Sequence, residues 1–367
     1  MEINNQSQKA GDYSSQFQAQ TQNFNLTLGI DEDKAREICR YECQKVMLEW
    51  EQTAKDIALQ RISMFEDRVM SKVSSYDKAF EAFTDPAFQI LIRKAQISAA
   101  CSDREEDYDI LADLLLHRVE KKTDCYKKLA ISKAIEVVDA IDKHALVALS
   151  VMYALHVYKP VSKNIDDGLS ALDELFSKII GENSLPNGRD WIEHADLLGA
   201  ARMSPNIMSF KKFEEVEQLQ LPFYFFKGIE LNSEQHLQII SEFKKCGLPN
   251  CLNEITLKKG FLFVDLPTFD LDDIIISSNV NGQLSKMHLN SQQKDCLSKT
   301  IKIANNPDYN DTAIKNHFWE KWNQHTTLNT IREWWNKLPI LFETTLMGDA
   351  LASAYIKGRY PQIPAMF

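Results

Sequence analysis

The spacing of apolar residues predicts helices over most of the chain. Between Ala35 and Val73 apolar side chains recur every three or four positions, which places them on one narrow stripe of a helix. Asp31 can cap its first turn. The pattern predicts one helix of about forty residues from Asp31 to Val73, roughly 60 Å long, with Trp50 on the stripe. A helix of that length needs a partner, so we expect a coiled-coil-like contact with another copy.

The segment before this helix has a different spacing of apolar residues. Aromatic and aliphatic side chains alternate with glutamines from residue 13 onward, and the frame changes near Asn23. Alternation is typical of an extended strand, and glutamines stack when identical copies pair in register. Residues 1–30 are therefore either an oligomerising β ribbon or an unfastened polar tail. The residues expected to join copies are Tyr13, Gln16, Phe17, Gln18, Gln20, Phe24, Leu26 and Trp50.

The helix-start signals and apolar spacing of residues 79–180 predict a compact helical bundle. Asp85 followed by Pro86 marks a helix start, because proline fits the first helical turn. The segment from Lys143 to Tyr158 is so apolar that we expect it at the centre of the bundle.

The remaining residues, 181–367, predict an α-rich C-terminal domain with one β-hairpin. Residues 255–266 (ITLKKGFLFVDL) hold two β-rich runs around a turn at Lys258-Lys259-Gly260, and Asn290 can cap a later helix. The chain is thus expected to be mainly α, with four parts. These are a ribbon or tail (1–30), a long helix (31–78), a helical bundle (79–180) and the C-terminal domain (181–367).

Four of the six tryptophans lie close together near the end of the chain, at Trp319, Trp322, Trp334 and Trp335. Such a cluster is typical of a domain core. The alternative is a partner-binding surface, since tryptophan is enriched at the residues that dominate binding energy.

Composition narrows the class of protein. The chain has 367 residues, 44% of them apolar, with a net charge of −10, so it can form real cores and lacks the clustered cations that nucleic acids require. Seven cysteines at irregular spacings are typical of reduced thiols in the cytoplasm. We find neither a signal peptide nor a stretch long enough to span a membrane, and therefore expect a cytoplasmic protein without membrane contact.

One pattern is similar to a catalytic motif. Arg189 and His194 stand five residues apart at a predicted helix start, which resembles the R-x4-H motif of HEPN-type ribonucleases. In such enzymes an arginine stabilises phosphate and a histidine acts as general acid or base. The simpler interpretation is a surface arginine and a histidine at the edge of a helix.

Metal and cofactor sites are not expected. Four thiols, at Cys39, Cys43, Cys246 and Cys251, could meet around zinc, but their spacing does not match a zinc knuckle. The acidic run at residues 270–273 (DLDD) fits a helix-capping turn better than a magnesium site. The chain has no phosphate-binding glycine loop and no nucleophile elbow, so we expect no cofactor.

Several segments carry a family resemblance. QSQKAGDYSSQFQ, GIDEDKAREIC, AFTDPAFQILIRKAQ, DILADLLLHRV and KLAISKAIEVVDAIDKHALVALSVMY resemble a family of uncharacterised bacterial proteins with a glutamine-rich N-terminal Q-x-A-G-D-x-S-x-Q-x-Q segment. The helical part is also similar in style to Abi-alpha-type abortive-infection proteins. These resemblances imply a cytoplasmic bacterial protein in antiphage defence, and they supply no catalytic residues.

The sequence favours a non-enzymatic, self-associating interaction or sensor protein, with a homo-oligomer and a protein partner as its expected contacts. The alternative is a HEPN-like, metal-independent ribonuclease that uses Arg189 and His194.

Overall fold

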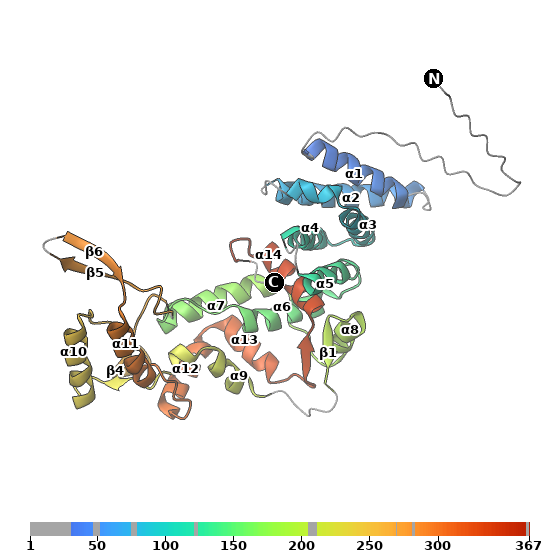
Figure 1. Cartoon of the computed structure of the whole chain (residues 1–367). Coiled ribbons are helices and arrows are strands. Elements are labelled where there is room, and N and C mark those ends of the chain that lie inside the picture. Colours follow the sequence, from blue (N-terminus) through green and yellow to red (C-terminus); the bar gives the residue numbers. More distant parts are fainter. Residues whose placement is uncertain are drawn as a thin grey trace, which may run out of the picture.

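The computed structural model describes residues 31–46, 52–74, 79–120, 124–204, 211–268, 270–280, 283–364 and 367. Within these residues the chain forms fourteen α-helices, two 3-10 helices and seven short strands, so the prediction of a mainly α protein is confirmed. The elements lie along an elongated molecule, with α1 at one end and α10 at the other (Figure 1). The predicted ribbon of residues 1–30 lies outside the described residues.

The helices are α1 (Glu32–Val46), α2 (Gln52–Val73), α3 (Pro86–Cys101), α4 (Glu105–Glu120), α5 (Cys125–Ile135), α6 (Lys143–Val157), α7 (Ile165–Ile180), α8 (Asp190–Leu198), α9 (Phe213–Gln220), α10 (Glu234–Cys246), α11 (Ser291–Ala304), α12 (Thr312–Gln324), α13 (Thr326–Trp335) and α14 (Leu346–Arg359). The 3-10 helices are η2 (Ala79–Thr84) and η3 (Pro222–Tyr224). The strands are β1 (Ala201–Met203), β2 (Ile229–Glu230), β3 (Leu252–Ile255), β4 (Lys258–Val264), β5 (Ile275–Val280), β6 (Gln283–His288) and β7 (Phe342–Thr344).

The described chain begins with two helices, α1 and α2, that lie against each other (Figure 1). Arg36 on α1 forms an ion pair with Asp67 on α2, with 3.3 Å between Nη1 and Oδ1. In one straight helix these two residues would stand about 46 Å apart, because each residue adds ~1.5 Å. The prediction of a single long helix from Asp31 to Val73 is therefore wrong.

The apolar stripe of this region is buried within the same chain. Cys39, Phe65 and Val69 are at most 2% exposed and belong to the main hydrophobic cluster, because α1 packs on α3, and α2 packs on α3 and α4. Two shorter helices can bury the stripe on the bundle, which a single projecting helix could not do. The stripe therefore gives no support to a coiled coil between copies. Trp50 lies outside the described residues.

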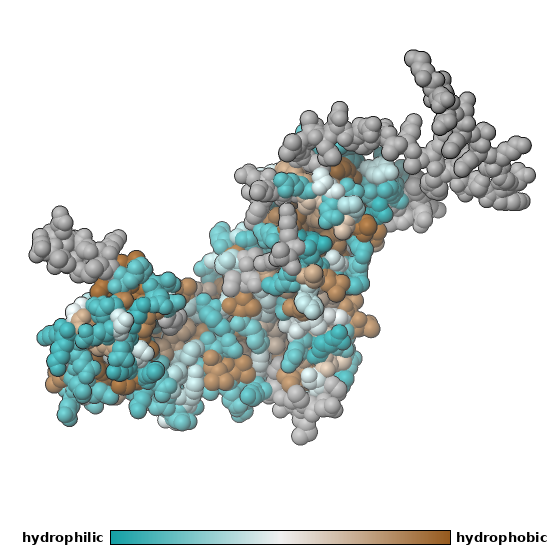
Figure 2. All heavy atoms as spheres, in the orientation of Figure 1, coloured by the Kyte–Doolittle hydropathy of each residue, from teal (hydrophilic) through white to brown (hydrophobic). Residues whose placement is uncertain are grey.

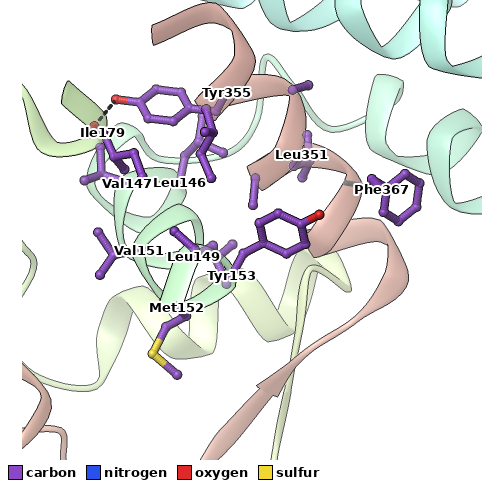
Figure 3. Packing of buried hydrophobic residues seen from close by; sticks show 14 of the residues in the cluster. Leu146, Val147, Leu149, Val151, Met152, Tyr153, Ile179, Leu351, Tyr355 and Phe367 are labelled. Carbon is purple, nitrogen blue, oxygen red and sulfur yellow. Dashed lines mark hydrogen bonds between the residues drawn. The ribbon is translucent and has the colours of Figure 1, made fainter. Parts of the chain in front are cut away.

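Helix α6 lies at the centre of the bundle, as its apolar composition predicts. Every residue from Ala145 to Leu155 is buried, and α7, α8 and α14 pack around the helix. Figure 3 shows side chains of α6 and α14 packed together near Phe367, with the Tyr355 hydroxyl donating to the carbonyl oxygen of Ile179 at 3.1 Å. The last long helix thus completes a core that the middle of the chain begins.

A glycine lets α14 approach this core. A Cβ atom at Gly348 would lie 2.0 Å from the carbonyl oxygen of Ala200, a distance that no side chain tolerates. Beside this contact β1 pairs with β7 antiparallel, with Ala201 opposite Thr344. Backbone from two distant parts of the sequence therefore meets at Gly348, where only glycine fits.

Residues 228–304, called the insert below, have a hydrophobic cluster of their own between α10, α11 and strands β2 to β4. The two ends of the insert are adjacent. Phe226 pairs with Pro307 in an isolated antiparallel bridge, and the N–H of Lys227 donates to the carbonyl oxygen of Asn306 at 2.8 Å. The other described residues form the body, which holds most of the main cluster; Ile255, Leu257 and Phe263 of the insert also belong to it. The division of the chain into four parts stays a prediction.

The predicted hairpin is present as β3 and β4, which pair antiparallel with Leu252 opposite Val264. Its turn falls at Thr256 and Leu257 instead of at Lys258 to Gly260, because Leu257 is buried in the main cluster. β2 adds to the other edge of β4, and two further antiparallel pairs, β1–β7 and β5–β6, were not predicted.

Candidate ligand-binding cleft

The two residues of the ribonuclease-like motif take part in structural contacts at the start of α8. Arg189 precedes the helix and forms an ion pair with Glu193, with 2.5 Å between Nε and Oε1. His194 Nε2 accepts the backbone N–H of Asp142 at 3.0 Å. This bond occupies the lone pair that a general base would use on a substrate. The chain places Arg189 just before α8 and His194 within it, and gives each a partner within the protein.

Three of the four clustered tryptophans are buried. Trp322, Trp334 and Trp335 are at most 5% exposed, and each indole N–H donates to a backbone carbonyl oxygen at 2.8 to 2.9 Å. Trp322 and Trp335 pack against Phe213, and the half-buried Trp319 lies at the edge of this group. The burial makes these rings part of the core of the body.

The cysteine candidates do not come together. Cys39 and Cys43 are buried on α1, whereas Cys246 and Cys251 belong to the insert. Burial raises the pKa of the Cys39 thiol to about 12, so this thiol stays protonated near neutral pH. Among the described residues, no group of three or more His, Cys, Asp or Glu side chains is placed to hold a metal ion.

The residues predicted to join copies cannot be placed, because they lie outside the described residues. They are Tyr13, Gln16, Phe17, Gln18, Gln20, Phe24, Leu26 and Trp50.

A cleft of about 980 Å³ lies where the insert meets the body. Three segments line it: the connection between α6 and α7, the end of α9 with η3, and the chain that follows β4. Its volume falls at the upper end of the range of about 300 to 1,000 Å³ that is typical of ligand pockets. On the face of the molecule seen in Figure 2, hydrophilic side chains dominate and hydrophobic patches are scattered between them.

Much of the cleft lining is rigid and apolar. Pro160, Pro222 and Pro267 lie on the three different segments, and Phe223 adds an aromatic ring. Val161, which follows Pro160 in the first segment, is 97% exposed. A nearly bare valine beside three prolines gives a surface that an apolar ligand group could cover.

Two lysines of the cleft differ in how their charge is balanced. Lys163 on the body forms an ion pair with Asp265 of the insert, with 2.5 Å between Nζ and Oδ1, and donates to the carbonyl oxygen of Leu266 at 2.5 Å. Lys159 donates to the carbonyl oxygen of Leu155 and forms no ion pair with a described residue. Lys163 thus joins the insert to the body. The charge of Lys159 is less well balanced by nearby acids than the charge of Lys163.

A buried acid acts on Lys159. Glu217 on α9 is 3% exposed and lies one helical turn before the cleft residue Gln220, and its carboxylate accepts no hydrogen bond from another described residue. Burial raises the pKa of Glu217 to about 7, and the charge of Lys159 opposes that rise. Burial lowers the pKa of Lys159, and the charge of Glu217 opposes that fall. An acid and a base that are both pushed toward neutrality beside a cleft are typical of a functional site.

Sequence reasoning missed this cleft. Pro160 is visible in the sequence as the end of a helix, but the cleft needs three segments spread between Lys159 and Thr268, and no local pattern brings them together. Glu217 does have a local signal. It stands four residues after the buried Phe213 and four before the buried Leu221, so it interrupts the apolar face of a helix with an acid.

Comparison with known proteins places the chain in a family. A protein-family model whose description reads ":-like" matches residues 29–361. The chain belongs to that family. The match covers the body, the insert and all three segments of the cleft. No curated protein and no solved structure matches the chain. No described helix is both long and apolar enough to cross a bilayer.

Proposed function

We propose that this protein is a non-enzymatic interaction or sensor component that binds a ligand in the cleft between body and insert. The observation that carries the proposal is the position of the cleft. Its lining comes from two parts that each have a hydrophobic cluster, although Ile255, Leu257 and Phe263 of the insert pack into the main cluster of the body. A ligand that contacts both parts can stabilise one relative orientation over another. The ion pair between Lys163 and Asp265 at the cleft is one contact that such a change would make or break, and the ion pair between Lys258 of the insert and Asp311 of the body is another.

The sensor proposal is tested by measuring that orientation. One spin label on exposed Leu237 in the insert and one on exposed Tyr126 in the body report the separation of the two parts by pulsed electron resonance. We expect Lys163→Met to widen or shift the distance distribution, because one of the two ion pairs that join the described parts, Lys163–Asp265 and Lys258–Asp311, is lost. Lys299→Met, which breaks a surface ion pair with Asp295 inside α11, is the control and should leave the distribution unchanged. An unchanged distribution for Lys163→Met contradicts a mobile junction.

Self-association through residues 1–30 is the second part of the proposal. It is supported by the alternation of apolar residues and glutamines in that segment, which suits pairing between identical strands. Light scattering should give a larger particle for the full chain than for residues 31–367. The full-length variant Phe17→Ser, Phe24→Ser should also be smaller. Equal masses for all three chains would refute assembly through this segment.

A role in bacterial antiphage defence rests on the similarity in style to Abi-alpha-type abortive-infection proteins. It predicts that expression of the gene in a bacterial host lowers the plating efficiency of at least one phage. Deletion of residues 1–30 should restore plating, because assembly is then lost. Unchanged plating across a broad phage panel would argue against this role.

The alternative function is a HEPN-like ribonuclease, and one experiment can distinguish it from the proposed function. It requires Arg189 and His194 to act on RNA, whereas both are engaged within the chain. If the purified protein degrades RNA and Arg189→Ala abolishes that activity, the non-enzymatic proposal fails.

A further inference from the structure

We propose that the cleft takes a small amphipathic organic anion, whose apolar part lies on the prolines and whose anionic group lies beside Lys159. This inference rests on the proposed function in one respect, namely that the cleft is the binding site. It adds the chemical class of the ligand, which follows from the apolar lining, from the charges in the cleft and from the volume.

The apolar half of the ligand follows from the lining. Prolines 160, 222 and 267 line the cleft together with Phe223 and Leu266. Proline rings lose no side-chain freedom when they are covered, so contact with them carries little entropic cost. Val161 is 97% exposed at the same site, and an aliphatic or aromatic group in the cleft would remove it from water.

The anionic group of the ligand follows from the charges of the two lysines, of which only Lys163 is paired with an acid. Asp265 already neutralises Lys163, so that lysine offers little attraction to a ligand. Lys159 has only a backbone carbonyl and the more distant charge of Glu217 as partners. A carboxylate, sulfonate or phosphate next to Lys159 would form a charge-assisted hydrogen bond, which is stronger than a neutral one. Ser162, Gln220 and Thr268 add further hydrogen-bonding groups around it.

Other ligand classes fit less well. A nucleic-acid strand needs several lysines or arginines along its path, and the cleft lining offers two lysines, one of them neutralised. A metal cation prefers several oxygen ligands, whereas the one lining carboxylate, Asp265, is bound to Lys163. The volume of about 980 Å³ suits a ligand of drug-like size.

The experiment uses the full chain and two matched fluorescent probes. 1-Anilinonaphthalene-8-sulfonate carries two aromatic groups, a naphthalene and a phenyl ring, and one sulfonate. N-phenyl-1-naphthylamine is the same molecule without the sulfonate. We expect the sulfonate probe to bind at least about tenfold more tightly than the neutral probe. Lys159→Met should weaken the sulfonate probe about tenfold or more and change the neutral probe less than about twofold.

A second variant tests the same site in case Lys159→Met fails to fold. Val161 is almost fully exposed, so Val161→Glu leaves the core intact while placing a negative charge in the cleft, and it should also weaken the sulfonate probe about tenfold. Lys299→Met, on the surface of α11, should bind both probes as the wild type does.

Two results would overturn the inference, and they differ in what they imply. If both probes bind with equal strength to the wild type and to Lys159→Met, the cleft still binds ligands but does not select an anion. If neither probe binds the folded wild-type chain, the cleft is not a small-molecule site, and the proposed function falls with it.

Discussion

Replacement of Glu217 by glutamine should stabilise the protein at alkaline pH and have little effect at acidic pH. Glutamine has nearly the same shape as glutamate, so the change leaves the packing of α9 intact and removes only the titration. Glu217 is 3% exposed, and its carboxylate accepts no hydrogen bond from another described residue. Ionisation of this carboxyl in the folded protein is therefore costly, because burial disfavours the charged form.

The magnitude follows from the shift of the pKa of Glu217, which burial raises from 4.5 in the unfolded chain to about 7 in the folded protein. A raised pKa means that the folded state binds the proton more tightly than the unfolded state. The resulting stabilisation is fully present below pH 4.5 and is lost as the pH rises through 7. Each pKa unit corresponds to about 1.4 kcal/mol, so the wild type should lose on the order of 3 kcal/mol from this group, most of it between pH 5 and 8.

The assay compares the free energy of unfolding of wild type and Glu217→Gln in urea at several pH values from 5 to 8. Titrating groups other than Lys159, whose pKa depends on the charge of Glu217, contribute equally to both chains and cancel in the difference. That difference should move in favour of Glu217→Gln by about 2 to 3 kcal/mol over this range. Glu215→Gln, an exposed change on the same helix, is the control and should show a constant difference. A constant difference for Glu217→Gln, or a loss of stability at pH 8, would refute the reasoning.

Three further predictions concern packing and use urea unfolding as the measurement. His194→Ala should cost about 1 kcal/mol, because the N–H of Asp142 loses its acceptor; no change would mean that water replaces the imidazole. Trp322→Ala should cost about 3 to 5 kcal/mol, because a fully buried ring is removed, and a cost below 1 kcal/mol would contradict its place in the core. Gly348→Ala should cost about 1 to 3 kcal/mol through the clash with backbone, whereas Gly358→Ala on the same helix meets only ordinary contact and should cost nothing.

Helix starts could be predicted from the sequence because capping acts within one turn. The Asp85 side chain accepts the N–H of Ala87 at 2.9 Å, and Asn290 forms a capping box with Gln293. The central position of α6 was also predictable, since a helix that is apolar on every side has to be buried on every side. Information of this kind depends only on neighbouring residues.

The remaining features depend on contacts between distant residues. The apolar stripe between Ala35 and Val73 is the same for one long helix and for two packed helices, and only the bundle surface decides between them. The cleft likewise needs Pro160, Pro222 and Pro267 to meet, which the sequence does not encode locally. Glu217 is the exception, because an acid on an apolar helix face could have been noticed from spacing alone.

The packing of α14 against α6 has a consequence for biosynthesis. About 200 residues separate the two helices in the chain, so α6 leaves the ribosome about 10 to 40 s before its covering helix, at usual rates of translation. During that interval an almost entirely aliphatic surface has no native partner on that side. Exposed hydrophobic surface on a nascent chain favours aggregation, so a premature stop before α14 would leave a product prone to aggregation instead of a smaller working protein.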